Sequence, residues 1–242
     1  MGCTDSRNEI LDEESLIKTE ELNLGYSKFH CDKIDLIFKR YSLSSKMHGS
    51  QFLTACRELT LDMSLYGNPD KPLTKFYHSF KMNYKHFNQR RLSTLGVLLG
   101  QGSHKEKAKV LFKIYDIVKD NTLDESEMRI MIEDILEIAL VIIPTYAYNL
   151  TQDEEKKVEL GKYIKKLGSV LDTMIKYYEI LFSQGQGTVI TFNDFVDMFD
   201  KEEINALGNS SRIRKLSIRE HGRVIAPATL VKDFILEAGK KN

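Results

Sequence analysis

The residues best suited to chemistry lie in one short segment, 116–127, where oxygen-bearing side chains recur at close intervals. With Asp116 counted as position 1, positions 1, 5, 7, 9 and 12 carry Asp116, Asp120, Thr122, Asp124 and Glu127. Calcium is a hard cation that takes roughly six to eight oxygen ligands, so carboxylates at this spacing on a tight loop can surround it. The segment therefore predicts calcium binding.

Two positions of this segment depart from the usual pattern of a calcium loop. Position 3 is Val118, which offers no side-chain oxygen, and position 6 is Asn121, where glycine normally makes the sharp turn. Asparagine is the next-best residue after glycine for a left-handed backbone. Four acidic side chains remain, so we expect a weakened site. The alternative, a loop kept for its shape that binds no metal at cellular calcium, stays open.

The segments on either side of this loop predict two amphipathic helices. Apolar residues recur at helical spacing at Val110, Leu111, Ile114 and Tyr115 before the loop, and at Met128, Met131, Ile132 and Ile135 after it. Helix–loop–helix spacing also appears at 31–59, at 73–99, and where a long helix ending at Leu181 leads into a loop at 183–194 and an exit helix at 192–199, but those loops are poor in acids. Cys56 falls on an apolar stripe and is expected in the core. The fold class that follows is all-α.

Composition and motifs exclude several classes of function. The 242-residue chain has a net charge of zero, which argues against nucleic-acid binding. Three scattered cysteines argue against disulfides and structural zinc and favour a reducing compartment. No secretory signal or spanning segment is expected, since the most apolar run, 135–143, is short and stops at Pro144. Nucleophile elbow, zincin helix, P-loop and CxxC motifs are missing, so we expect neither an enzyme nor a small-molecule substrate.

The first six residues, MGCTDS, match the N-myristoylation signal M-G-x-x-x-[ST]. Gly2 would carry the acyl chain, and Cys3 beside it is a candidate for palmitoylation. One myristoyl chain holds a protein at a membrane only marginally, so a stable anchor needs a second signal. Because residues 1–22 are acidic, a basic patch in that leader does not supply it. We therefore expect lipidation at both Gly2 and Cys3.

The last hundred residues contain three features outside the helix–loop–helix pattern. We expect Pro144–Asn149 to break the chain, and Thr151 with Glu154 to cap one long helix that runs to Leu181. Residues 210–223 are basic and are expected to be a solvated linker, although Arg214–Ser217 would also suit a kinase that reads basic residues. Residues 226–238 predict a short amphipathic tail helix.

Four helix–loop–helix units, a lipidation signal and one calcium loop resemble the calcineurin B-like and neuronal calcium sensor group of EF-hand proteins over residues 28–207. The match is strongest at Phe112–Glu127, which reads F-x-x-x-D-x-x-x-D-x-x-x-D-x-x-E. The resemblance implies two paired EF-hand lobes and a hydrophobic groove that binds a helix of a target protein. The implied calcium ligands are the carboxylates named above, with Thr122 supplying its backbone carbonyl. It also implies that Leu123 and Ile190, at position 8 of their loops, pair across a short β-bridge.

These expectations divide the chain into four regions. Residues 1–27 form a lipidated acidic leader, and residues 28–102 a degenerate EF-hand pair. Residues 103–207 form a second pair with an insert at 144–167, longer than the usual link. Residues 208–242 form the basic linker and the tail helix.

Two hypotheses of function stand at this point. The first is a non-enzymatic regulatory or adaptor protein, a calcium sensor held by its acyl chains on the cytoplasmic face of a membrane. The second is a calcium-independent structural component of a cytoskeletal or ciliary assembly, in which degenerate hands act as rigid helical modules.

Overall fold

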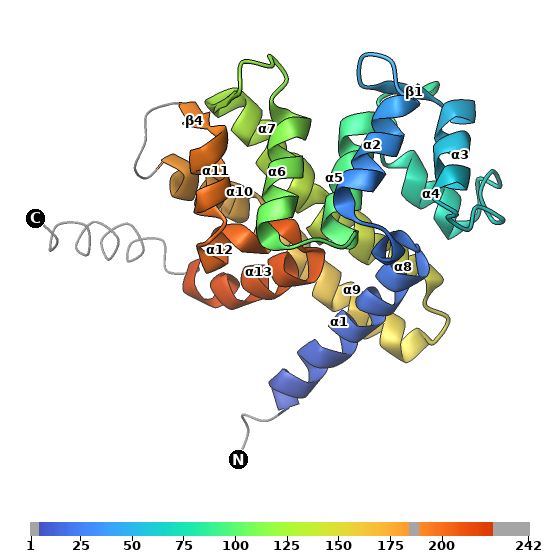
Figure 1. Cartoon of the computed structure of the whole chain (residues 1–242). Helices are drawn as coiled ribbons and strands as arrows, with labels where there is room; N and C mark the ends of the chain where they lie inside the picture. The colour runs from blue at the N-terminus through green and yellow to red at the C-terminus, as the bar shows by residue number, and fades with distance from the viewer. Residues whose placement is uncertain (1–4, 184–188, 225–242) are drawn as a thin grey trace, which may run out of the picture.

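The computed structural model describes residues 5–183 and 189–224, and their side-chain surroundings for 13–183 and 189–219 (Figure 1). The described chain is mostly helical, which confirms the all-α prediction at this level. Gly2, Cys3 and the expected tail helix at 226–238 lie outside the described residues.

The first half of the chain is built from helices joined by two short strands. Its elements are α1 (Asp5–Asn23), η1 (Tyr26–Lys28), α2 (Cys31–Arg40), β1 (Lys46–His48), α3 (Gly49–Glu58), α4 (Pro72–His78), β2 (His86–Asn88) and α5 (Gln89–Leu99). The helices expected between residues 31 and 99 are therefore present. Cys56 is fully buried, as expected of a small core residue.

The second half repeats this plan and adds further helices. Its elements are α6 (His104–Tyr115), β3 (Thr122–Asp124), α7 (Glu125–Glu137), the π-helical η2 (Ile138–Ile142), α8 (Ile143–Leu150), α9 (Glu154–Ser169), α10 (Leu171–Ser183), β4 (Val189–Thr191), α11 (Phe192–Met198), α12 (Glu202–Asn205), η3 (Ala206–Gly208) and α13 (Ser210–Val224). The apolar stripes predicted on either side of the 116–127 loop are buried on α6 and α7.

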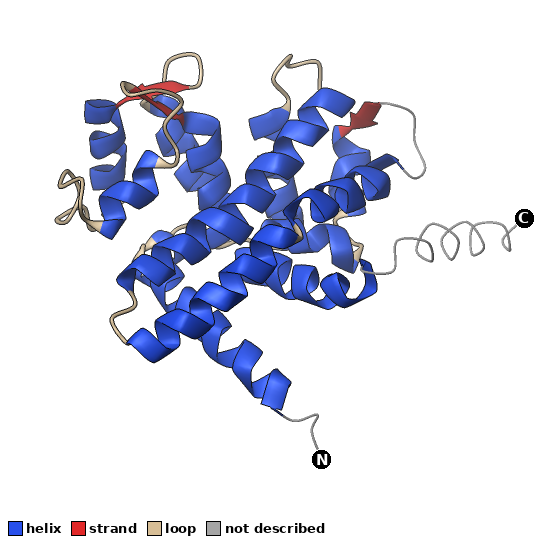
Figure 2. Ribbon diagram, turned by 180° about the vertical axis from the view of Figure 1, so that it is seen from behind, coloured by secondary structure: helices blue, strands red, loops and turns tan. Residues whose placement is uncertain are grey.

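Two antiparallel strand pairs join the loops of neighbouring helix–loop–helix units. In the β1–β2 pair Met47 faces Phe87, and in the β3–β4 pair Leu123 faces Ile190, as the sequence predicted for position 8. All four side chains are buried, so each short pair is held by the core beneath it. Both pairs lie at the same end of the molecule (Figure 2).

The expected chain break at Pro144 is wrong, because the helix continues through it. Helices α7, η2 and α8 form one run from Glu125 to Leu150. Proline has no N–H and its ring crowds the preceding turn, which disfavours an α-helical interior position. The π-helical turn absorbs the conflict: the N–H of Ile143 donates to the carbonyl of Ile138, five residues back.

The single long helix expected from Thr151 to Leu181 is also wrong in its cap and its length. Asp153 is the N-cap and accepts from the N–H groups of Glu155 and Lys156, whereas Thr151 donates its hydroxyl to the carbonyl of Ala147. Val170 then separates the run into α9 and α10. An aspartate two residues closer to the helix competes successfully for the cap because its charged oxygen suits the helix N-terminus.

Residues 210–223, expected as a solvated linker, form the packed helix α13. Arg214 and Ser217 have exposed fractions of 0%, so Ser217 does not present an accessible kinase site in this structure. The acidic leader is likewise more than a leader. Helix α1 packs against α8 and α9, with Ile17 fully buried. Both helices are rich in charged residues, so their composition alone did not predict that one face of each is buried.

Helices α1, α8, α9 and α13 lie together below the strand-bearing end of the molecule (Figure 1). Contacts join α1 to α8 and α9, and α13 to η2 and α9. In the described part of the chain, no helix combines the length and apolarity that crossing a bilayer requires.

Candidate metal centre

The predicted calcium ligands lie on the loop that joins α6 to α7. Helix α6 ends at Tyr115, and Asp116 is its C-cap, with its N–H bonded to the carbonyl of Phe112. Helix α7 starts after its N-cap, Asp124, and Glu127 lies in its first turn. Strand β3 between them pairs with β4, so the loop is fixed at both ends and at its middle.

The backbone of the loop makes the sharp turn that the sequence required. Asn121 has a φ of 64°, in the left-handed region, and Lys119 has a φ of 63°. The expectation that asparagine replaces glycine at position 6 is therefore met in backbone conformation. Left-handed residues other than glycine are uncommon and gather at ligand loops and switches.

Glu127 is buried and connects the start of the loop to its end. Its Oε1 accepts from the N–H groups of Ile117 at 2.7 Å and Val118 at 3.1 Å. Its Oε2 accepts from the N–H of Asp124 at 3.2 Å, and Asp124 Oδ1 in turn accepts from the N–H of Glu127 at 2.8 Å. These two predicted ligands thus lie together, but their carboxylates cap the N-terminus of α7 as a capping box and do not face a common metal position.

Asp120 stabilises the middle of the loop. Its Oδ1 accepts from the Thr122 N–H at 2.9 Å and from the Thr122 hydroxyl at 2.6 Å. Both bonds lower the pKa of the Asp120 carboxyl, because they favour its charged form, and the bond from the hydroxyl has the larger effect. Asp120 is exposed and ionised at neutral pH, as a ligand for a divalent cation must be.

Asp116 contains the atom that most needs a partner. Its Oδ1 is buried and has no hydrogen-bond partner in the structure. A buried carboxylate oxygen without a donor is costly, and such atoms are rare in folded proteins. A cation at position 1 of the loop would remove that cost, so this residue fits the group that the sequence predicts.

The four carboxylates nevertheless do not converge. Within residues 5–183 and 189–224, no group of three or more acidic, histidine or cysteine side chains is close enough to hold a metal ion. Glu127 serves backbone N–H groups instead, and Val118 at position 3 is 69% exposed and lacks a donor oxygen. The donor set and the turn suit calcium, but binding requires Glu127 to leave its present partners.

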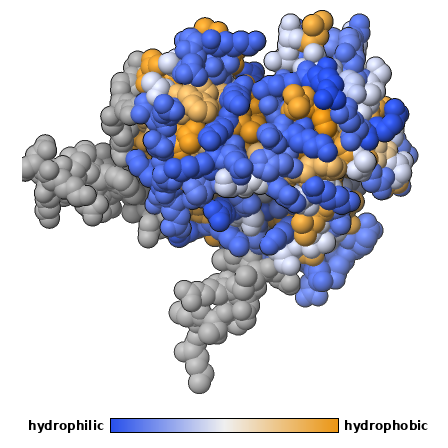
Figure 3. All heavy atoms as spheres, in the orientation of Figure 1, coloured by the Kyte–Doolittle hydropathy of each residue, from blue (hydrophilic) through white to orange (hydrophobic). Residues whose placement is uncertain are grey.

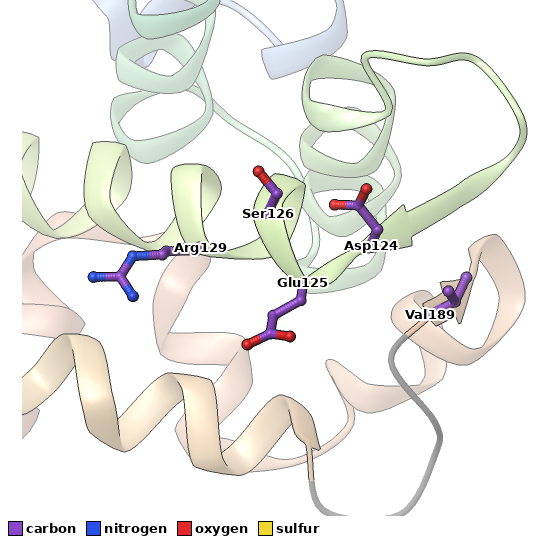
Figure 4. A pocket seen from close by; sticks show the side chains of 5 residues that line it. All are labelled: Asp124, Glu125, Ser126, Arg129 and Val189. Atoms are coloured by element: carbon purple, nitrogen blue, oxygen red, sulfur yellow. The ribbon is translucent and has the colours of Figure 1, made fainter.

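A shallow hollow of about 440 Å³ lies beside this loop (Figure 4). It is lined by Asp124, Glu125, Ser126, Arg129 and Val189. Arg129 pairs with Glu133 on its own helix and with Glu179 on α10, so the basic side of the hollow is already neutralised. Asp124 and Glu125 point in different directions in this view, and Asp124 is the one predicted ligand that lines the hollow.

The sequence did not reveal a buried ionic cluster that joins the two ends of the described chain. The guanidinium of Arg214 contacts Glu14, with Nη2 to Oε1 at 2.7 Å, and Glu21, with Nη1 to Oε1 at 2.9 Å. The hydroxyl of Tyr163 donates to Glu14 at 3.0 Å, and that of Ser210 donates to Glu21 at 2.6 Å. All five side chains are buried. We call this set the Arg214 cluster.

A faint sequence signal for the Arg214 cluster exists. Ser210, Ile213, Arg214 and Ser217 share one helical face, since they are spaced three, four and seven residues from Ser210. That face has no large apolar residue besides Ile213, so its burial follows from distant partners on α1, η2 and α9.

No protein-family model matches this chain, and no curated protein matches it. The assignment of function therefore depends on the geometry above and on the motif at residues 112–127.

Proposed function

We propose that this protein is a membrane-anchored EF-hand protein that binds calcium and acts as a regulator or adaptor. The observation that carries the proposal is the pair of antiparallel strand contacts, Met47 with Phe87 and Leu123 with Ile190. Each contact joins the loops of two helix–loop–helix units, which is the arrangement of paired EF-hands. The loop between α6 and α7 supports the calcium assignment through its donor spacing and the unpartnered oxygen of Asp116.

The switching element in this proposal is Glu127. Its carboxylate now links the first turn of α7 to the backbone just after α6, through the N–H groups of Ile117 and Val118. To hold a calcium ion, Glu127 would have to give up those bonds, which would change the constraint between the two helices. Sensor EF-hands expose apolar surface by a change of this kind. The exposed surface would take a helix of a target protein.

The membrane part of the proposal involves residues outside the described chain. Acyl chains on Gly2 and Cys3 would hold the protein at the cytoplasmic face of a membrane. Mass spectrometry of the N-terminus from native cells measures this directly. A terminus that retains Met1, or that is acetylated and not acylated, would remove the anchor from the proposal.

Isothermal calorimetry of the purified full-length protein tests the calcium loop. We expect heat on addition of calcium to the wild type and none for Asp116→Asn, which removes a ligand charge at nearly constant volume. Glu125→Gln is the matched control, because it removes a charge at position 10, which is not a ligand position. Equal heats for wild type and Asp116→Asn, or no heat at millimolar calcium, would exclude this site.

A gain of function gives an independent test of the same loop. Val118→Asp places a carboxylate at position 3, the missing ligand, and should tighten calcium binding by about ten-fold or more, since affinity follows the ligand charge count. Ile117→Asp adds the same charge one residue earlier, where no ligand is expected. An equal gain from both substitutions would mean that general electrostatics, and not coordination, controls the affinity.

A second candidate function is a calcium-independent structural component of a cytoskeletal or ciliary assembly. It is favoured by one observation: the carboxylates of the described residues do not converge on a metal position. Cell fractionation separates the candidates. Pelleting with detergent-resistant filaments in the presence of a calcium chelator supports the structural role, whereas release by detergent supports the membrane anchor.

A further inference from the structure

The β1–β2 pair connects two loops that leave it from opposite ends of the antiparallel ladder, at the strand-bearing end of the molecule. The register sets Met47 opposite Phe87 and His48 opposite His86, whose rings lie 4.3 Å apart. Phe87 stacks on Phe52 in the core at 4.2 Å. We call residues 42–46 and 81–85, the turns that lead into β1 and β2, the basic loop pair.

Large apolar side chains stand exposed on these loops. Leu43 is 77% exposed, Tyr84 is 81% exposed and Met82 is 51% exposed. In the space-filling view, hydrophobic atoms form the outermost tip over the loop between α2 and β1 (Figure 3). Single exposed apolar side chains are common on protein surfaces, but here three large ones lie on the two short loops that flank one strand pair.

The turns that carry these side chains are held by hydrogen bonds. Leu43 and Lys46 exchange both backbone bonds, at 2.8 and 3.0 Å, around Ser44 and Ser45, which have φ values of 48° and 59°. Two successive left-handed residues form a tight hairpin turn that usually selects asparagine or glycine. The turn therefore holds Leu43 at an exposed position, although Ser44 and Ser45 adopt a backbone conformation that is unfavourable for serine.

The second loop is fixed in the same manner. Asn83 Oδ1 accepts from the N–H groups of Lys85 at 3.0 Å and His86 at 2.9 Å, so Tyr84 projects from a defined turn. Hydrogen bonds thus define the backbone of both turns of the basic loop pair.

Positive charge surrounds the apolar tip. Lys46, Lys81 and Lys85 lie on the two loops, and neither stretch 41–57 nor stretch 71–105 contains an aspartate or glutamate. The Lys85 ammonium lies 5.2 Å from the centre of the Tyr84 ring, and that of Lys81 lies 5.3 Å from the Phe87 ring. An aromatic ring does not neutralise an ammonium group, so these positive charges stay available to an anionic partner.

The shape and chemistry of this surface favour one class of partner. A target helix needs a groove, whereas these loops protrude from the end of the molecule. Nucleic acid would match the lysines but not an apolar tip. An anionic bilayer matches both, because apolar and aromatic side chains enter the acyl boundary while lysines contact headgroups.

We propose that the basic loop pair docks on an anionic lipid bilayer, with Leu43, Met82 and Tyr84 in the interface and Lys46, Lys81 and Lys85 on its headgroups. This contact is separate from the proposed acyl anchor. Helix α1 begins at the opposite end of the molecule from the two loops (Figure 1). The proposal therefore holds or fails without regard to acylation.

Vesicle co-sedimentation of the full-length, unacylated protein tests this contact. The vesicles contain phosphatidylcholine alone or with about one third phosphatidylserine. We expect binding to the anionic vesicles only, reduced at least about ten-fold when the three loop lysines become glutamine, since each contributes on the order of a five-fold change near the surface. The matched control changes Lys156, Lys165 and Lys166 on α9 to glutamine, which alters the net charge equally at exposed sites.

Fluorescence locates the contact. The chain has no tryptophan, so Leu43→Trp creates a single probe at the tip of the first loop. Its emission should shift to the blue with anionic vesicles and stay unchanged with phosphatidylcholine. Circular dichroism melts show that the variants fold.

Several outcomes would overturn the proposal. These are no wild-type binding to anionic vesicles, an equal loss in the α9 control, or a probe at position 43 that stays in water while the protein binds. Capture of an acidic protein by the wild type without vesicle binding would assign the loops to a protein partner instead.

Discussion

Arg214 is the residue whose surroundings are most constrained in this structure. Its guanidinium is fully buried and meets two buried carboxylates, so the ionised cluster has one more negative than positive charge. Burying such groups costs much free energy, which close pairing and added hydroxyl donors offset in part. The cluster therefore contributes little to the net free energy of unfolding, but the loss of any one partner would lower that free energy substantially.

Replacing Arg214 with methionine, which has a similar length, leaves two buried carboxylates without their cation. We expect a loss of about 3–5 kcal/mol in the free energy of unfolding. Urea denaturation followed by circular dichroism measures the change, and Lys215→Met, at an exposed neighbouring position, should cost less than about 0.5 kcal/mol. An Arg214→Met protein as stable as wild type would show that the carboxylates are neutral or solvated.

Lys107 is the second buried cation, and its contribution depends on pH. Its ammonium donates to the carbonyl of Gly208 at 2.8 Å, and burial lowers its pKa to about 8. An unfolded chain keeps this proton up to about pH 10.4, so between these values the unfolded state binds more protons and stability rises with pH.

The stability of wild type relative to Lys107→Met should therefore increase between pH 8 and pH 10.5, by roughly 3 kcal/mol in total. Urea melts at half-unit steps of pH provide the curve. Lys109→Met, at an exposed position on the same helix, should give a flat difference. A decrease over that window would contradict the direction of the pKa shift.

At the scale of single residues, the sequence predicted where the acidic residues and the turn lie, but not which way the side chains point. The positions of the acids and the left-handed Asn121 followed from local rules, since backbone sterics at a turn depend on few neighbours. The direction of the Glu127 carboxylate did not follow, because it depends on which N–H groups the neighbouring turn of the chain presents. The calcium ligands themselves stay a prediction.

At the scale of elements, the packing of α2 on α5 depends on a missing side chain. A Cβ on Gly96 would lie 2.4 Å from Cγ2 of Ile34, much closer than real contacts allow. Glycine in a helix interior costs about 1 kcal/mol relative to alanine, so its presence here reflects the close approach of the two helices.

Gly96→Ala should therefore destabilise the protein by about 1–3 kcal/mol, despite the better helix propensity of alanine. Thermal melts compare it with Gly49→Ala, where a Cβ meets no atom within 4 Å. Combining Gly96→Ala with Ile34→Ala removes the clashing methyl, so the double variant should lose less than the sum of the single losses. Strict additivity would place the cost elsewhere.

The continuous run through Pro144 shows why element boundaries were hard to predict. With Ile143 bonded to Ile138, the next π-type donor for the Ala139 carbonyl would be Pro144, which has no N–H. Arg214 Nη1 donates to that carbonyl at 3.3 Å. A residue seventy-five positions away thus compensates for the proline, and local sequence holds no trace of such a partner.

At the scale of the whole molecule, the repeated helix–loop–helix plan could be predicted because apolar periodicity sets it locally. The packing of α1 and α13 could not, since both helices are rich in charge and are buried against distant segments, α1 against α8 and α9, and α13 against η2, η3 and α9. Their contact joins Glu14 to Arg214, two hundred residues apart.

Removal of residues 1–24 should destabilise the rest of the protein by at least about 3 kcal/mol, because Arg214 then lies without its carboxylates. Differential scanning calorimetry compares this truncation with one that begins at Asp5 and keeps α1 whole. A peptide of residues 5–24 added to the truncated protein should restore the melting temperature. The same peptide with Glu14→Gln and Glu21→Gln should not. Restoration by both would assign the effect to apolar contacts alone.

The sequence separation of this contact sets an order of events during synthesis. Chains emerge from the ribosome with the N-terminus first, at about 5–20 residues per second. Glu14 and Glu21 on α1 are therefore without their cation for at least about ten seconds, until Arg214 has been synthesised. Helices α8 and α9, on which α1 also packs, are synthesised before Arg214, so the apolar contacts of α1 can form earlier than its ion pairs.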